Sequence, residues 1–119
     1  MSEYYVEGKE ILGLNLTSET LSKGEYENCV FKNCSLTNGS LSGYKFIDCQ
    51  FVDCDLSMTK LIDTSMNGVL FKSCKMLGLH FDDCKSFLFD VRFENCQLNL
   101  TNFYKVSLKK LHSIAVAFM

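Results

Sequence analysis

Large apolar residues recur at every fifth position through most of this sequence of 119 residues. The run is unbroken from Tyr26 to Phe81, and after a shift of two residues it continues from Leu88 to Leu108. Stepping backwards, the same phase reaches Val6. A helix places apolar residues three and four apart, and a strand alternates them. The five-residue period therefore fits neither element and indicates short extended segments joined by regular corners.

Two other positions of the five-residue repeat also hold a characteristic type of residue. A mostly small residue (Cys, Gly, Thr or Val) stands two positions before each large one, with Tyr44 and Leu79 as exceptions. Side chains two apart on an extended segment share a face, so both residues are expected to point inward. Two positions after the large residue the chain mostly holds Asn, Asp, Gly or Ser, which tolerate a tight bend. Each unit is thus predicted to bury two side chains and to end in a corner.

Units such as Cys29–Asn33, Cys34–Asn38 and Gly39–Gly43 resemble the pentapeptide repeat family. The family pattern is a small residue, Asp or Asn, Leu or Phe, and two polar positions, although the second position here often holds Ser, Lys or Gln. The resemblance implies an all-β fold. In that fold, a right-handed quadrilateral parallel β-helix, four units make one coil, and this chain is long enough for about four to five coils.

That geometry predicts that residues 20 apart stack on one another. Similar sizes within a column let stacked side chains fill the interior. The predicted core-stacking residues are Phe31, Phe51, Phe71 and Phe93 in one column, and Leu36, Leu56, Met76 and Leu98 in the next. A third column holds Leu41, Leu61, Phe81 and Phe103, and a fourth holds Tyr26, Phe46, Met66 and Leu88.

The repeat divides the chain into three predicted segments. Residues 1–23 form an N-terminal cap or irregular first coil, and residues 24–110 form the β-helix, with a two-residue insertion near 85–88. Residues 111–119 form an apolar tail that leaves the repeat, because Ser113 occupies an expected centre. This tail either caps the last coil or forms a dimer contact through Ile114, Val116 and Phe118. Dimers through C-terminal ends occur in the family, so the resemblance implies a homodimer.

All seven cysteines stand at the inward small position. An odd number of them argues against a full disulfide framework, and the position favours buried free thiols acting as small apolar filler. Free thiols fit a reducing compartment, and so the cytoplasm. A metal site of Cys29, Cys34, Cys49 and Cys54 is the competing interpretation, but Cys-x4-Cys is not the spacing of zinc modules. We expect no metal and no cofactor.

The sequence offers no recognisable catalytic motif. Nucleophile elbows, phosphate-binding glycine loops and His-Glu-x-x-His pairs are missing. The two histidines, His80 and His112, are expected at the surface without a partner. Carboxylates are spread over corners and outward faces (Asp48, Asp53, Asp55 and Asp63). We therefore predict that the protein is not an enzyme.

Charge and hydropathy exclude two further classes of partner. The net charge of −2 is too balanced for direct nucleic-acid binding, and no run of 18 apolar residues could span a membrane.

The predicted function is a non-catalytic protein-interaction scaffold whose partner is unknown. Its candidate partner-binding surface consists of outward apolar residues, with Phe87 or Phe89 exposed by a bulge at the insertion; the alternative is scattered surface hydrophobes. The candidates are Ile47, Ile62, Phe87, Phe89 and Tyr104.

A second function comes from the resemblance. Segments such as Cys54–Met58 and Lys72–Met76 are similar to quinolone-resistance-type pentapeptide repeat proteins. This implies a DNA-mimicking modulator of a type II topoisomerase, DNA gyrase. The short rod, the small net charge and the basic residues near the C-terminus count against it.

Overall fold

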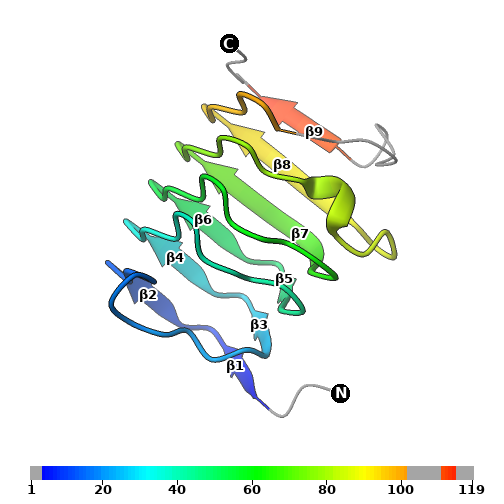
Figure 1. Cartoon of the computed structure of the whole chain (residues 1–119). Helices are drawn as coiled ribbons and strands as arrows, with labels where there is room; N and C mark the ends of the chain where they lie inside the picture. Colours follow the sequence, from blue (N-terminus) through cyan, green and yellow to red (C-terminus); the bar gives the residue numbers. More distant parts are fainter. Residues whose placement is uncertain (1–3, 102–110, 115–119) are drawn as a thin grey trace.

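The computed structural model describes residues 4–101 and the backbone of residues 111–114. The chain winds as a stack of coils in which strands from successive coils lie side by side (Figure 1). The strands are β1 (Tyr5–Glu7), β2 (Glu10–Leu12), β3 (Glu25–Glu27), β4 (Val30–Lys32), β5 (Lys45–Ile47), β6 (Gln50–Val52), β7 (Ser65–Lys72), β8 (Asp90–Glu94) and β9 (Leu111–Ile114). A 3-10 helix, η1, spans Phe81–Asp83.

The strands pair in parallel and build two walls. Wall 1 consists of β1, β3, β5 and the first half of β7, and wall 2 consists of β2, β4, β6, the second half of β7, β8 and β9. Isolated bridges join successive coils on wall 3, as between Ser35 and Asp55, and on wall 4, between Ser40 and Lys60. Partners as far as β7 are 20 residues apart, as in the Phe31–Phe51 pair. This ladder confirms the predicted parallel β-helix.

The corners between walls depend on residues that accept a left-handed backbone. Asn28 and Asp48 have φ angles of 54° and 52°, and Gly68 occupies the same corner in the next coil with φ 71°. Asn, Asp and Gly adopt this region more readily than other residues do. The turn-forming column of the sequence therefore marks the places where each wall ends.

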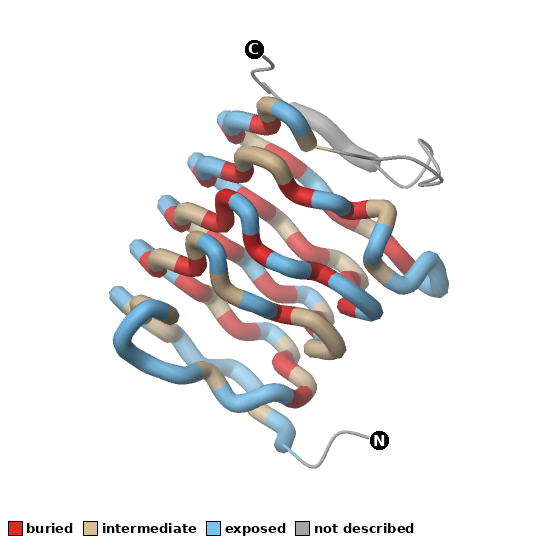
Figure 2. Tube along the Cα trace, viewed as in Figure 1, coloured by how far each residue is buried: buried red, intermediate tan, exposed pale blue. Residues whose placement is uncertain are grey.

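The interior is a column of stacked aromatic rings. The Phe31, Phe51, Phe71 and Phe93 rings are buried, and successive centroids lie 4.7, 5.2 and 5.6 Å apart. Their planes are within 16° of parallel, and each such pair contributes about 0.5–1.5 kcal/mol beyond its buried area. The second predicted column is also buried: Leu36, Leu56, Met76 and Leu98. Burial alternates with exposure along each coil (Figure 2).

The small inward residues tie each coil to the one before it. The Thr59 hydroxyl donates to the Leu36 carbonyl at 2.8 Å, and the Cys54 thiol donates to the Phe31 carbonyl at 3.2 Å, 23 residues earlier in both cases. Tyr44, an exception in the sequence pattern, makes the same connection, because its hydroxyl donates to the Leu21 carbonyl at 2.5 Å. Cysteine thus serves here as a hydrogen-bond donor as well as a small filler.

The structure corrects the predicted register after the insertion. Leu88, expected in the core, is 52% exposed, whereas Phe89 is 3% exposed and packs against Phe81. The pairing gives the reason: Asp90 lies opposite Asn67, 23 residues away, but Val91 lies opposite Val69, 22 residues away. Three residues are therefore inserted before Phe89, and one is deleted opposite Gly68. The sequence shows only the net shift of two.

Parallel pairing is also present in the predicted N-terminal and C-terminal segments. At the N-terminal end, β1 and β2 already pair with β3 and β4, so Val6 stacks beneath Tyr26. At the other end β9 pairs with β8, and Ser113 lies opposite Phe93. The backbone ladder therefore continues past Ser113. Among the residues described, no helix is long and apolar enough to cross a membrane.

Candidate partner-binding groove

The inserted residues form a tight turn whose tip is apolar. The Phe89 amide donates to the Ser86 carbonyl at 3.2 Å, which places Phe87 and Leu88 at the two central positions. Phe87 is 79% exposed, and Leu88 adopts a left-handed φ of 57°. A large aliphatic residue is uncommon in that region, where the backbone is strained. The turn therefore presents two large apolar side chains in a conformation that local preference disfavours.

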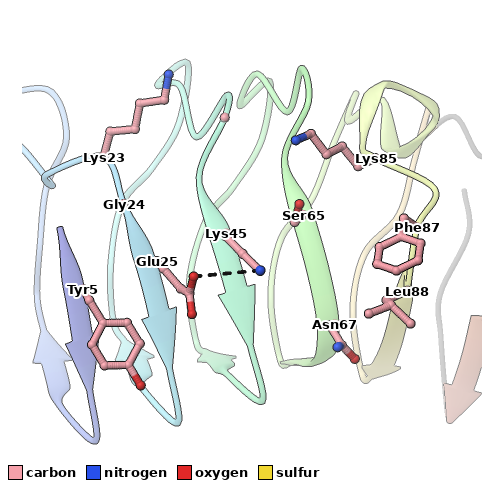
Figure 3. A pocket seen from close by; sticks show the side chains of 11 residues that line it. Tyr5, Lys23, Gly24, Glu25, Lys45, Ser65, Asn67, Lys85, Phe87 and Leu88 are labelled. Atoms are coloured by element: carbon pink, nitrogen blue, oxygen red, sulfur yellow. Dashed lines mark ion pairs between the residues drawn. The ribbon is translucent and has the colours of Figure 1, made fainter. Parts of the chain in front are cut away.

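This turn borders one end of a groove on wall 1, which we call the wall-1 groove. Its volume is about 810 Å³. Tyr5 on β1 lies at one end, and Phe87 and Leu88 lie at the other, beyond β7 (Figure 3). The groove thus crosses the strands and runs along the axis of the coils. Its lining residues are Tyr5, Lys23, Gly24, Glu25, Gly43, Lys45, Ser65, Asn67, Lys85, Phe87 and Leu88.

The repeat itself builds the floor of the groove. Tyr5, Glu25, Lys45 and Ser65 pair in register, so their side chains form one outward column. Gly24 stands beside this column, and a Cβ there would lie 2.3 Å from the Tyr4 carbonyl oxygen. Only glycine fits at that position, because the neighbouring coil approaches so closely.

Positive side chains outnumber negative ones in the lining of the groove. Lys45 Nζ lies 3.8 Å from Glu25 Oε1, and both side chains are partly exposed. Lys23 and Lys85 form no ion pair with any residue in the described part of the chain. At the far end, the Tyr5 hydroxyl donates to Glu27 Oε1 at 2.7 Å, and this bond raises the pKa of Tyr5 above its ordinary value. Tyr5 is therefore a neutral, oriented ring, and the groove carries three lysines against one carboxylate.

The structure separates the five residues predicted for a partner-binding surface. Phe87 lines the groove, and Ile47 is half-buried on β5 outside its lining. Ile62 is exposed on wall 4, and the burial of Phe89 removes it from any surface. Tyr104 lies outside the described residues. The sequence analysis missed Leu88, Tyr5 and the three lysines, although the 20-residue spacing that found the core also predicts the outward column from Tyr5 to Ser65.

The predicted dimer contacts lie at the C-terminal end. Ile114 belongs to β9, whose backbone pairs with β8. Val116 and Phe118 fall outside the described residues. Within those residues, β9 has a paired strand only on its β8 side.

Residues considered for chemistry do not converge in the part of the chain described. The cysteines there are free, and burial raises the pKa of Cys49 to about 11. No group of three or more His, Cys, Asp or Glu among these residues could hold a metal ion. His80 Nδ1 lies 3.6 Å from Asp82 Oδ1 on wall 4, and His112 belongs to β9. The wall-1 groove is thus the one concave feature that we assign as a candidate site.

Comparison with known proteins agrees with this architecture. A family profile described as "Pentapeptide repeat region" matches residues 25–87. The crystal structure of a pentapeptide repeat protein, Rfr23, from the cyanobacterium Cyanothece 51142 aligns with a TM-score of 0.61 at 13% identity, covering 97% of this chain and 84% of Rfr23. Full-length QnrB1, a plasmid-mediated fluoroquinolone resistance protein, aligns at 14% identity over 98% of this chain and 94% of QnrB1, with a TM-score of 0.35.

No curated protein sequence matches the chain. The profile match covers more than half of the sequence, and the strands, corners and stacked columns have the form expected of its repeats. The chain belongs to the pentapeptide repeat family.

Proposed function

We propose that this protein is a non-catalytic interaction module that binds a partner protein through the wall-1 groove. The observation that carries the proposal is the exposed Phe87–Leu88 turn at one end of that groove. Large apolar side chains held out in water lose the free energy that burial would give, about 1.5–3 kcal/mol for a side chain of this size. A partner that covers Phe87 recovers that energy.

Backbone strain at Leu88 supports the same proposal. A left-handed non-glycine residue raises the energy of the folded chain by about 1–3 kcal/mol. Glycine at this position would avoid the strain, and a polar residue would avoid the exposed apolar surface. The turn has neither, which is expected where the side chains themselves make contact with a partner.

Capture experiments with two matched variants test the proposal. Phe87→Ser removes the exposed ring from the turn, whereas Leu12→Ser removes an exposed apolar side chain from β2 on wall 2. We expect a binding protein that the wild type retains to be lost from Phe87→Ser and kept by Leu12→Ser. Equal retention by the wild type and Phe87→Ser would remove the groove as the binding surface.

The charge of the groove does not favour the topoisomerase alternative. A protein that imitates duplex DNA needs dense negative charge on its exposed surface. The lining of the wall-1 groove instead carries Lys23, Lys45 and Lys85 against Glu25 alone. We therefore do not extend the proposal to DNA mimicry.

A further inference from the structure

We propose that the wall-1 groove binds an extended acidic segment of a partner protein, with one large apolar side chain of that segment held against Phe87 and Leu88. This inference rests on the proposed function and names the chemistry of the partner. Three features of the groove carry it: unneutralised positive charge, the spacing of the lysines along the groove, and an apolar contact at one end.

The positive charge is available to a ligand. Glu25 offsets part of the charge of Lys45, at 3.8 Å, but Lys23 and Lys85 have no acidic partner among the residues described. Their side chains border the groove on the same side in Figure 3. Carboxylates entering the groove would gain charge-assisted hydrogen bonds to the Lys23 and Lys85 ammonium groups, which form no ion pair within the described part of the chain.

The lysines are distributed along the groove rather than gathered at one point. Lys23 lies two residues before β3, Lys45 lies in β5, and the Lys85 amide donates to the Thr64 carbonyl, which places Lys85 one coil beyond Ser65 and two coils beyond Lys45. Successive coils are about 4.8 Å apart, so the four steps from β1 to the coil that holds Phe87 and Leu88 cover about 19 Å, the length of about six residues of an extended peptide. A single small anion cannot contact all three ammonium groups, whereas a chain bearing several carboxylates can.

The apolar end of the groove favours a peptide over a nucleic acid. Phe87 and Leu88 provide an apolar contact beside Lys85, which suits one large side chain following an acidic stretch. Carboxylates also lie beside the groove on wall 1, because Glu27 accepts the hydrogen bond of the lining residue Tyr5 and Glu7 pairs in register with Glu27. They would repel a continuous phosphate backbone, and nucleic-acid affinity depends on several lysine or arginine contacts to phosphates. A peptide can place its carboxylates at the lysines and neutral residues elsewhere.

Fluorescence anisotropy with labelled synthetic peptides tests the inference on the full chain. The probe is a decapeptide of alternating glutamate and serine with one phenylalanine near its end, and the controls are the same peptide with lysine for glutamate and a single-stranded DNA decamer. We expect the acidic peptide alone to bind, with an affinity that falls as salt is added. The double variant Lys23→Glu, Lys85→Glu should weaken binding at least about tenfold.

Two further variants sharpen the result. Lys32→Glu, Lys72→Glu makes the same change in net charge on exposed positions of wall 2, and it should alter binding less than about twofold. Glu25→Gln removes the carboxylate that competes for Lys45, and it should tighten binding about two- to fivefold.

Several outcomes would overturn the inference. They are failure of the acidic peptide to bind, equal weakening by the wall 2 double variant, and equal or tighter binding of the DNA decamer. If Phe87→Ser still abolishes partner capture when the acidic peptide fails, the proposed function stands and the acidic partner is wrong. If Phe87→Ser has no effect on capture either, both proposals fall.

Discussion

Phe87 and Phe89 are two positions apart in the chain, yet their surroundings are opposite. Phe87 stands at the tip of the turn in solvent, while Phe89 contacts the Phe81 ring at a centroid distance of 6.2 Å. Both are phenylalanines, so residue type does not distinguish them, and only the local register makes one exposed and the other buried. The register is set by three inserted residues before Phe89 and one deleted after it.

Substitution of these two phenylalanines should give contrasting stabilities. Phe89→Ser removes a buried ring and leaves a hydroxyl in apolar surroundings, so it should lower the free energy of unfolding by about 3–5 kcal/mol. Phe87→Ser should change it by less than about 0.5 kcal/mol, because the ring is exposed. Urea denaturation followed by circular dichroism measures both. Similar losses in the two variants would show that the register described here is wrong.

Single-sequence reasoning reaches the core residues more readily than the turn. Phe31, Phe51 and Phe71 follow from periodicity, because a side chain buried in every coil leaves a mark in every coil. Leu88 and Phe89 could not be assigned in that way. An insertion and a deletion that partly cancel leave only their difference in the sequence, and several placements give the same net shift.

At the scale of the element, the small inward residues connect each coil to the one before it by hydrogen bonds. Their thiol and hydroxyl groups donate to carbonyls 23 residues earlier, and 25 residues earlier beyond the insertion, as from Cys96 to Phe71. Cys and Thr are interchangeable in this role because both carry a donor on a short side chain. The sequence pattern predicts the small size of these residues, but their shared bond depends on backbone geometry that only the structure supplies.

Replacement of Cys54 tests the contribution of this hydrogen bond between coils to stability. Cys54→Ser keeps a donor that can reach the Phe31 carbonyl, as Thr59 and Thr64 reach theirs at 2.8 Å, and it should cost less than about 1 kcal/mol. Cys54→Ala loses the donor and leaves a small cavity, and it should cost about 1–2 kcal/mol. Thermal unfolding monitored by calorimetry ranks the two. A more stable alanine variant would argue that the thiol acts only as filler.

Thiol chemistry offers a second test at this scale. The thiolate is the reactive form, and burial raises the pKa of Cys49 to about 11 and that of Cys84 to about 12. Both thiols therefore stay protonated at pH 8 and become reactive only at higher pH or on unfolding. Ellman's reagent should label the native protein slowly and all seven cysteines in denaturant. Fast stoichiometric labelling of the native protein at pH 8 would contradict this burial.

At the scale of the whole molecule, the ends of the stack determine how copies of the chain can meet. A terminal strand of a parallel ladder presents unpaired backbone groups, which favours pairing with another chain. Among the residues described, β9 is such a strand, because it pairs with β8 alone. The wall-1 groove lies on a side of the stack, so binding at the groove leaves the C-terminal end accessible.

We expect the protein to form a homodimer through its C-terminal end. Light scattering at micromolar concentration should give twice the mass of one chain. Ile114→Lys adds a charge to β9 and should shift the protein toward the monomer, because lysine on an edge strand opposes pairing. Leu12→Lys, a change of the same kind on β2 at the opposite end, should leave the dimer intact. A monomeric wild type, or dissociation by the β2 variant alone, would contradict this arrangement.

The chain rejoins the parallel ladder at Asp90, which lies opposite Asn67. The number of residues in the turn before Asp90 therefore does not set the spacing of the later coils. We thus expect a longer or chemically different tip between Cys84 and Phe89 to leave the Phe71–Phe93 stacking and the pairing of β8 in place. If the turn binds a partner as we propose, we expect that exchange of this one short stretch can change the partner while the rest of the fold stays constant. Foreign hairpins grafted at this junction should therefore be displayed by the protein without a change in the register of its later coils.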